Sequence, residues 1–431
     1  MWIARRVVSI LTLCGLAALA WYSLLFARAD AAFRGNNLPA LRTAVRLVPG
    51  NADYHALLAE YLETAGADPD GELAIATDLS PHESRFWIRR SFRAEMERKY
   101  ADSERYLQQA YRVDKGFDPR WALMNYYFRR GNIPEFWRWT QEALDMSYGG
   151  LDPLFRLCLT VDSDPSITRK ALPPRPAILF AFFSYLVKNQ QIGSAAPIAV
   201  EAASTARQED VPVLIDYCSR QLGHDNESSL AVWNTLCRRG LLRFRELAPR
   251  KGDILTNGDF AVAPLQRGFD WKYGTDAGVS IGPMDAAQGI SIDIGGKQPE
   301  TAWLMEQTIP LTPDKRYVLN YEYRLITAQP VSGLQWLILA AGTAAGAAPR
   351  AEDTSPGDPI AASSILSATD WNTGQMTFSS GRRNAARLAL RYRRVPGTVT
   401  WTGTVQIRHV TSGLAEPGQA EHVLPGSGTP Q

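Results

Sequence analysis

A helical pattern that recurs about every 33 residues is the sequence feature that most constrains the fold. Each copy has a small residue, an apolar residue three places on, and a helix-ending position two places further along. A single helix pair of this size cannot bury its own apolar face, so such repeats must stack on one another. The small residues are Ala44, Ala76, Ala110 and Ala143, and the ending positions are 49, 81, 115 and 148.

This period and its helix-turn-helix content resemble tetratricopeptide repeats. In the segment Tyr126–Leu144, Gly131-Asn132 would end one helix, and Pro134 suits the first turn of the next. Two of the four ending positions, Lys115 and Tyr148, lack the usual proline, and the Trp-Leu-Gly-Tyr signature of the first helix is absent. The resemblance implies stacked helix pairs over residues 30–170, whose concave surface binds a protein partner.

Helical patterns continue with poorer periodicity over residues 171–250. They include the apolar segment Ala177–Val187, which is too short to span a membrane and is expected to form a buried helix. Cys218 and Cys237 would lie on neighbouring helices, either as a disulfide or as free buried thiols. A set of aromatic residues would either line a groove or pack between helices: Phe86, Trp87, Phe92, Trp121, Tyr126, Tyr127, Phe136, Trp137 and Trp139.

The N-terminus carries an uncharged apolar run, Val7–Ala27, which is long enough to cross a bilayer as a helix. Arg5 and Arg6 precede the run and favour a cytoplasmic N-terminus. The alternative is a signal peptide cleaved in the small-residue stretch FARADA. We expect a retained anchor over residues 1–29, and in either case the rest of the chain is exported.

The apolar period changes to two after about residue 251. In the segment Tyr317–Leu325, every second residue lies on one face of the expected strand. In Thr400–Ile407, Trp401, Val405 and Ile407 share one face in the same way. Turn signals such as Asn257-Gly258 separate the strands. The pattern predicts an antiparallel β-sandwich over 251–413, most simply a jelly roll. Within it, 340–364 is expected to be a flexible loop, and 414–431 a disordered tail.

Several segments of this half occur in the order found in jelly-roll carbohydrate-binding modules of the galactose-binding-like superfamily. They are LTNGDF, GFDW, QTIPLTPDKRYVLNYEYR, DWNTGQMTF and GTVTWTGTVQI, between Leu255 and His409. The resemblance implies that LTNGDF opens the sandwich as its first strand and that the domain binds sugar. Members often place acidic residues near a structural calcium ion. Here Ala261 and Gly403 stand at those places, so no metal is expected.

Sugar binding needs an exposed aromatic face with polar groups beside it. Trp303 and Trp371 are the tryptophans least constrained by the strand alternation, and they are the candidates for stacking on sugar. Trp271 and Trp401 occupy motif positions that favour the core instead. The other aromatic residues considered for this role are Tyr273 and Trp336.

An arginine-rich segment, Arg382–Arg394, would form a strand with Leu388, Leu390 and Tyr392 facing inward. Its outward arginines would bind carboxylates or phosphates, as in an acidic polysaccharide or a lipid headgroup. The alternative is a solvated edge strand whose charges discourage pairing with other chains. The outward residues are Arg387, Arg391 and Arg393.

The sequence has no nucleophile elbow, no P-loop and no histidine pair at metal-binding spacing. The net charge of +2 argues against a nucleic-acid partner. The expected protein is therefore a non-enzyme without a cofactor, α then β in architecture: a transmembrane helix, an α-solenoid of tetratricopeptide-like pairs and a jelly-roll sandwich. It would be a single-pass scaffold of the bacterial inner membrane, largely periplasmic, serving extracellular polysaccharide or envelope glycan assembly. The alternatives are a protein-only adaptor in secretion and a glycan-processing enzyme.

Overall fold

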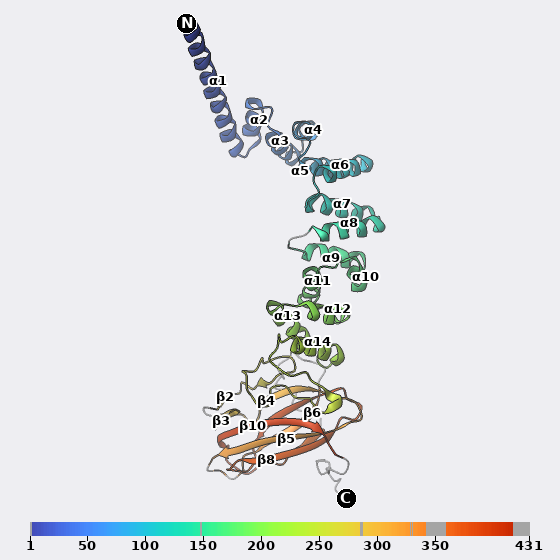
Figure 1. Cartoon of the computed structure of the whole chain (residues 1–431), viewed down its shortest axis with the longest axis vertical. Coiled ribbons are helices and arrows are strands. Elements are labelled where there is room, and N and C mark those ends of the chain that lie inside the picture. Colours follow the sequence, from blue (N-terminus) through green and yellow to red (C-terminus); the bar gives the residue numbers. More distant parts are fainter. Residues whose placement is uncertain are drawn as a thin grey trace. The chain divides into compact units, whose positions relative to one another are not determined.

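The computed structural model describes residues 2–146, 149–284, 288–327, 329, 331–341 and 359–416. The chain forms two compact units, Met1–Ile178 and Leu179–Gln431. The first is helical, and the second begins with helices and ends in two antiparallel sheets, which confirms the predicted order of α then β (Figure 1). Tyr148, most of the expected loop (342–358) and most of the expected tail (417–431) lie outside the described residues.

Helices of the first unit pack in successive pairs, α1 with α2, α3 with α4, α5 with α6, and α7 with α8. This is the pairing that tetratricopeptide repeats require, and it confirms the predicted stack. The helices are α1 (Trp2–Arg34), α2 (Leu38–Leu47), α3 (Ala52–Thr64), α4 (Asp70–Leu79), α5 (Ser84–Met96), α6 (Tyr100–Val113), α7 (Phe117–Arg130), α8 (Ile133–Asp145), α9 (Asp152–Val161) and α10 (Pro165–Ala171).

The small residue of each repeat lies at a helix contact. The second helix of each pair ends close to its expected position, and Pro49 and Pro81 each follow their helix end by two residues. A larger side chain at these sites would push the paired helices apart, because cores of this density tolerate little added volume. The small residues Ala44, Ala76, Ala110 and Ala143 are all fully buried.

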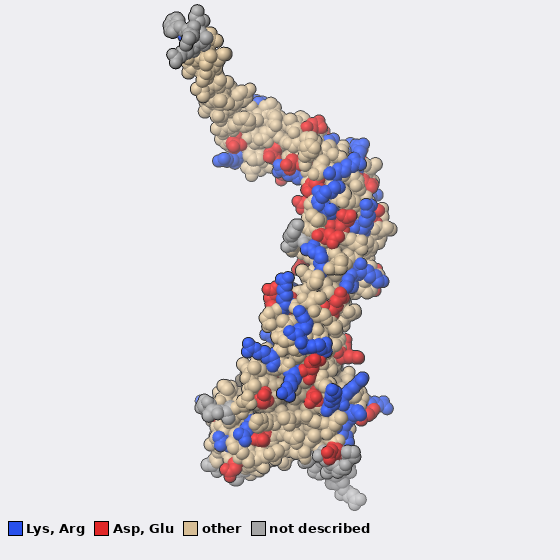
Figure 2. All heavy atoms as spheres, viewed as in Figure 1, with Lys and Arg blue, Asp and Glu red and all other residues tan. Residues whose placement is uncertain are grey.

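The apolar run and the first helix of the array are one continuous helix, α1. The stretch Arg6–Arg34 is long and apolar enough to cross a membrane, and its most apolar part is not buried. Figure 2 shows that part of α1 without charge on the visible face. Its last turns belong to the array instead: Ala29 is fully buried, and the rings of Phe33 and Tyr54 lie 4.9 Å apart.

The boundary between the units falls in the first turn of α11 (Pro176–Lys188), and the second unit continues with α12 (Ile192–Thr205), α13 (Val211–Gln221) and α14 (Asn226–Arg238). Short 3₁₀ turns lie at Gln208–Asp210 and Pro249–Lys251. Phe182, Phe183 and Leu186 are fully buried, which confirms that Ala177–Val187 forms a buried helix. Cys218 and Cys237 lie on α13 and α14 as free, buried thiols.

Among the residues that the structure describes, the sandwich consists of two five-stranded antiparallel sheets. Sheet I has the order β1-β4-β9-β6-β7, and sheet II has the order β2-β3-β10-β5-β8. The strands of sheet I are β1 (Lys272–Tyr273), β4 (Thr301–Pro310), β9 (Ala385–Arg393), β6 (Leu334–Ala340) and β7 (Ala361–Ala362). Those of sheet II are β2 (Val279–Pro283), β3 (Ile290–Gly295), β10 (Thr402–Leu414), β5 (Arg316–Ile326) and β8 (Asn372–Ser379).

The core of the sandwich is formed by the alternate residues that the sequence pattern predicts. On β5, every second residue from Tyr317 to Leu325 is buried. On β9, the buried inward residues are Leu388, Leu390 and Tyr392. Three tryptophans are also buried there, Trp271, Trp336 and Trp401. Trp336 is therefore excluded from stacking on a sugar, and Trp271 and Trp401 serve the core as expected.

The segment Ile254–Trp271 forms no strand, so the expectation of a first strand at LTNGDF is wrong. Asn257 and Phe260 adopt left-handed backbone angles, with φ of 54° and 55°. The backbone of Thr256 pairs with the side chain of Gln307 through two hydrogen bonds of 3.2 and 2.8 Å, and the Gly258 carbonyl accepts from the Val410 amide of β10 at 2.8 Å without a continuous ladder of strand pairing. Residues with φ above zero interrupt a strand, because they turn the chain out of the extended conformation.

Within the second unit, the last helix pair packs directly on this segment. The ring of Trp233 on α14 lies 5.8 Å from that of Phe269, and Asn226 donates to the side chain of Asn384 at 2.9 Å. Gly268 takes a φ of 65°, and a Cβ built on it would lie 2.6 Å from the Trp233 ring. Helix α14 and the loop before β1 therefore share one core.

Replacement of Gly268 by alanine tests this packing. We expect the change to destabilise the second unit by roughly 2–4 kcal/mol, from left-handed backbone strain plus a clash with Trp233. The matched control is Gly397→Ala, because Gly397 has a φ of 82° but open space at its Cβ position. The control should lose only the stability that corresponds to left-handed backbone strain, about 1–2 kcal/mol. Thermal unfolding of the full chain in detergent, followed by tryptophan fluorescence, measures both. Equal losses would contradict the proposed contact.

The buried carboxyl group of Asp270 should make the free energy of unfolding depend on pH. It is fully buried, and burial raises its pKa to about 6, although it accepts a hydrogen bond from the Leu265 amide at 2.6 Å. The unfolded pKa is about 3.9. Between these values the folded state binds more protons, so the unfolding free energy falls as pH rises from 4 to 6, by about 2–3 kcal/mol.

The variant Asp270→Asn keeps an acceptor for Leu265 and removes the titration. The stability difference between variant and wild type should therefore grow in favour of the variant from pH 4 to pH 6, and stay constant above about pH 7. Denaturant unfolding of both full-length proteins across this range measures the difference. A difference that does not change with pH would contradict the assignment to Asp270.

Candidate functional site

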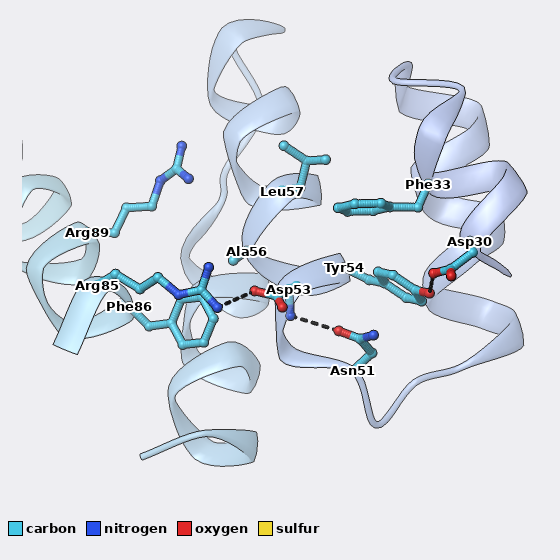
Figure 3. Close-up of a pocket in the computed structure, with 10 residues that line it drawn as sticks. All are labelled: Asp30, Phe33, Asn51, Asp53, Tyr54, Ala56, Leu57, Arg85, Phe86 and Arg89. Atoms are coloured by element: carbon cyan, nitrogen blue, oxygen red, sulfur yellow. Dashed lines mark hydrogen bonds and ion pairs between the residues drawn. The ribbon is translucent and has the colours of Figure 1, made fainter. Parts of the chain in front are cut away.

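A cleft of about 500 Å³ lies on the first unit, between α1, α3 and α5. Figure 3 shows Phe33 of α1 and Leu57 of α3 at one side, and Arg85 and Arg89 of α5 at the other. Phe33 and Leu57 are half-buried, so apolar surface remains in the cleft. Its full lining is Asp30, Phe33, Asn51, Asp53, Tyr54, Ala56, Leu57, Arg85, Phe86 and Arg89.

Polar groups of this cleft are already paired across helices. Arg85 contacts Asp53 at 2.6 Å, and Arg89 contacts Glu60 at 2.7 Å. The hydroxyl of Tyr54 donates to Asp30, and burial together with this bond raises the pKa of Tyr54 to about 12. The cleft therefore offers a mixed apolar and charged surface, which suits a peptide segment better than a small molecule.

Of the aromatic residues considered for a groove, most pack between helices. Phe86 lines the cleft with part of its ring, although it is nearly buried. Phe92 is 43% exposed, and Trp87, Trp121 and Trp137 are half-buried. The buried members are Phe86, Tyr126, Tyr127, Phe136 and Trp139.

On the sandwich, Trp371 lies at the outer surface of sheet II. The guanidinium carbons of Arg408 and Arg324 lie 4.0 and 5.0 Å from the centre of its ring. The indole remains half-exposed. Arg408 is held by Glu322 at 2.6 Å, and Arg324 donates to Gln406 at 2.6 Å. An aromatic ring is thus fixed beside a row of hydrogen-bonding groups.

The rest of this outer surface is polar across neighbouring strands. Register pairs Gln406 of β10 with Arg324 of β5 on one side and with Ser291 of β3 on the other. Thr404 donates to Asp293, and Gln375 of β8 donates to Asn320 at 3.1 Å. We call this the sheet II face. Its members are Ser291, Asp293, Asn320, Glu322, Arg324, Trp371, Gln375, Thr404, Gln406 and Arg408.

On the opposite sheet, Trp303 of β4 lies across from Arg391 of β9. The guanidinium carbons of Arg387 and Arg391 lie 5.4 and 6.0 Å from its ring centre. Arg393 is exposed at the end of the same strand. The structure thus brings together four predicted site residues on the outer surface of sheet I, and it places Trp371 on the other sheet.

Strand β9 is the central strand of sheet I, with β4 on one side and β6 on the other. The alternative interpretation, a solvated edge strand, is therefore wrong. Its arginines do not protect an exposed edge, because both edges of β9 are paired.

Sequence reasoning missed the partners that surround Trp371. Arg324, Glu322, Gln406 and Arg408 occupy the outward positions of β5 and β10, so the same alternation that predicts the core also predicts their direction. What the alternation does not give is which strands become neighbours. In the described part of the chain, no group of three or more His, Cys, Asp or Glu side chains is placed to hold a metal ion.

Comparison with known proteins gives no matching family model and no matching curated protein. Among solved structures, one described as a CBM4 module is 16% identical over 37% of this chain and 99% of its own, with a TM-score of 0.27. A putative sugar binding protein from Bacteroides thetaiotaomicron is 12% identical over 38% of this chain and 99% of its own, with a TM-score of 0.25. Pseudomonas aeruginosa pilF is 16% identical over 51% of this chain and 91% of its own, with a TM-score of 0.21.

The chain joins tetratricopeptide-like helix pairs to a jelly-roll sandwich of two antiparallel sheets. This statement rests on the helix pairing and on the two antiparallel sheets. Both expected domain types are therefore present in one chain.

Proposed function

We propose that this protein is a non-catalytic, membrane-anchored scaffold that binds a glycan through the sheet II face and a protein partner through the cleft of the helical array. Its setting would be the assembly or export of an extracellular polysaccharide or envelope glycan. The bulk of the chain would lie in the periplasm, with α1 in the inner membrane.

The glycan-binding part is supported above all by Trp371. Sugars present flat C–H surfaces that pack on aromatic rings, and hydroxyl groups that need donors and acceptors. Trp371 offers a half-exposed ring, and Arg324 and Gln406 offer guanidinium and amide groups beside it. These groups are held in place by hydrogen bonds to one another, so little side-chain entropy is lost on binding.

The membrane anchor is supported by the packing of α1. Cleavage in FARADA would leave only about one turn of the helix, which is too short to be stable alone. It would also break the packing of Ala29, and it would leave Phe33 on that short turn against Tyr54. A retained α1 supports both the first repeat and the attachment to the bilayer.

The protein partner is assigned to the cleft because of where the cleft lies. Asp30, which lines it, follows the end of the apolar run by three residues, or about 4.5 Å of helix. A partner in this cleft would therefore contact the scaffold close to the membrane surface, as the soluble end of another membrane protein would.

Glycan binding is tested by replacing Trp371 with alanine. Binding of the full chain in nanodiscs to a panel of immobilised neutral polysaccharides should weaken about tenfold, since stacking contributes about 1–1.5 kcal/mol. Trp121→Ala is the control, because Trp121 is equally half-buried but lies on α7. Binding that Trp371→Ala leaves unchanged would contradict the assignment. Absence of binding across the panel would favour the protein-only adaptor.

The cleft is tested by site-specific photo-crosslinking of the full chain in its membrane. A crosslinker at Leu57, which lines the cleft, should give a defined product with an integral membrane protein. The same crosslinker at Ile75 of α4, which is 40% exposed but does not line the cleft, should not. Identical products from both positions would argue against a specific partner in the cleft.

A further inference from the structure

The outer surface of sheet I carries an uneven distribution of charge around Trp303. Arg387 has a carboxylate partner, Glu306, at 3.2 Å. Arg391 has only a neutral partner, the side-chain oxygen of Gln335, at 3.3 Å. No carboxylate among the described residues lies within ion-pair distance of Arg391 or Arg393. We call Trp303, Glu306, Gln335, Arg387, Arg391 and Arg393 the sheet I face.

The two guanidinium groups nearest Trp303 are partly removed from water. The Nε groups of Arg387 and Arg391 are both buried and have no acceptor in the described part of the chain. Burial lowers the pKa of Arg391, and the charge of Arg393 lowers it further. A half-buried cation without an anion has lost hydration that no protein group replaces, so a bound anion would stabilise it.

An apolar patch lies beside these cations. Leu337 and Ala389 are fully buried on the outer side of sheet I, away from the main core, and the ring of Trp303 packs against them. The indole is thus fixed by apolar side chains, and it remains half-exposed. A ligand here would meet an aromatic surface and two guanidinium groups within about the width of one sugar ring.

We propose that the sheet I face binds a uronic-acid-containing polysaccharide, with a sugar ring packed against Trp303 and its carboxylate bound by Arg391 and Arg387. The proposal extends the proposed glycan-binding function to a second surface on the opposite sheet. A uronate combines the two features that this face requires, a C–H surface and a carboxylate on the same ring. A simple inorganic anion would leave the partly exposed ring of Trp303 unused.

The contrast with the sheet II face supports an acidic ligand at this position. On both faces the arginine closer to the tryptophan pairs with a glutamate and the other donates to a glutamine, so the contrast lies in the remaining charges. On the sheet II face the two arginines, Arg324 and Arg408, are balanced by Glu322 and Asp293. The sheet I face carries three arginines and one glutamate, so it has a net positive charge where the sheet II face does not.

Binding of the full-length protein in nanodiscs to immobilised polygalacturonate tests this proposal. Wild type should bind, and Arg391→Gln, which keeps a polar side chain but removes the charge, should weaken binding by roughly tenfold. Fully methyl-esterified polygalacturonate has the same backbone without carboxylates, and it should bind at least tenfold more weakly. Binding should also weaken as salt rises from about 50 to 300 mM, because exposed charge contacts are screened.

The matched control is Arg383→Gln. Arg383 is exposed in the turn before β9, so this variant removes the same charge away from Trp303. It should change the affinity by less than about twofold. A second variant, Trp303→Leu, keeps apolar packing and should weaken binding to polygalacturonate but not to dextran sulfate, a sulfated polymer that reports non-specific charge attraction. Melting curves of each variant verify that it is folded.

Several results would overturn the proposal. Equal losses for Arg391→Gln and Arg383→Gln would show attraction by net charge alone. Loss of polygalacturonate binding in Trp371→Ala, with none in Arg391→Gln, would place acidic glycan on the sheet II face. Binding to neutral polysaccharides without binding to polygalacturonate would reject this site and leave the proposed function standing. Binding to neither class would reject both.

Discussion

The packing of Ala29 and Phe33 against Tyr54 is the contact on which the first unit depends. It makes the last turns of an otherwise membrane-length helix the first element of a repeat array. Each later pair stacks on the one before, and the fully buried alanines set the spacing between helices. Repeat arrays obtain their stability from such neighbour contacts, so the first pair also serves as the cap of the array. The same helix thereby fixes the cleft near the membrane.

In the second unit, two surfaces of one sandwich show how similar residue types acquire different chemistry. Both have a half-exposed tryptophan with two guanidinium groups within 6 Å of the ring. On sheet II a glutamate neutralises the closer arginine, and amides surround the ring. On sheet I the closer arginine, Arg387, likewise pairs with Glu306, and the farther one, Arg391, bonds to Gln335. The net charge of each face, rather than the presence of tryptophan and arginine, therefore separates a neutral from an acidic ligand: sheet I carries three arginines and one glutamate, and sheet II carries two arginines, one glutamate and one aspartate.

The sequence predicts those features that depend on neighbours along the chain. The alanine spacing predicts the helix pairs, and the period of two predicts the buried faces of β5 and β9, because both patterns follow from local backbone geometry. The pairing of strands is non-local, so the sequence did not reveal that β9 is central or that Trp303 and Trp371 lie on opposite sheets. The segment at Asn257 forms a loop where a strand is predicted, because left-handed residues and side-chain hydrogen bonds leave little trace in an apolar pattern. Likewise, the apolar run gave no sign that α1 continues into the array.

The intact mass of the protein extracted from membranes tests the central claim most directly, which is that α1 joins the bilayer to the helical array as one uncut helix. The full chain, expressed with a C-terminal affinity tag, would be purified in detergent and measured by mass spectrometry. The account predicts a mass that includes the apolar run, allowing only for loss of Met1. A mature protein that begins near Asp30 would contradict it, because the first repeat would then lack its first helix.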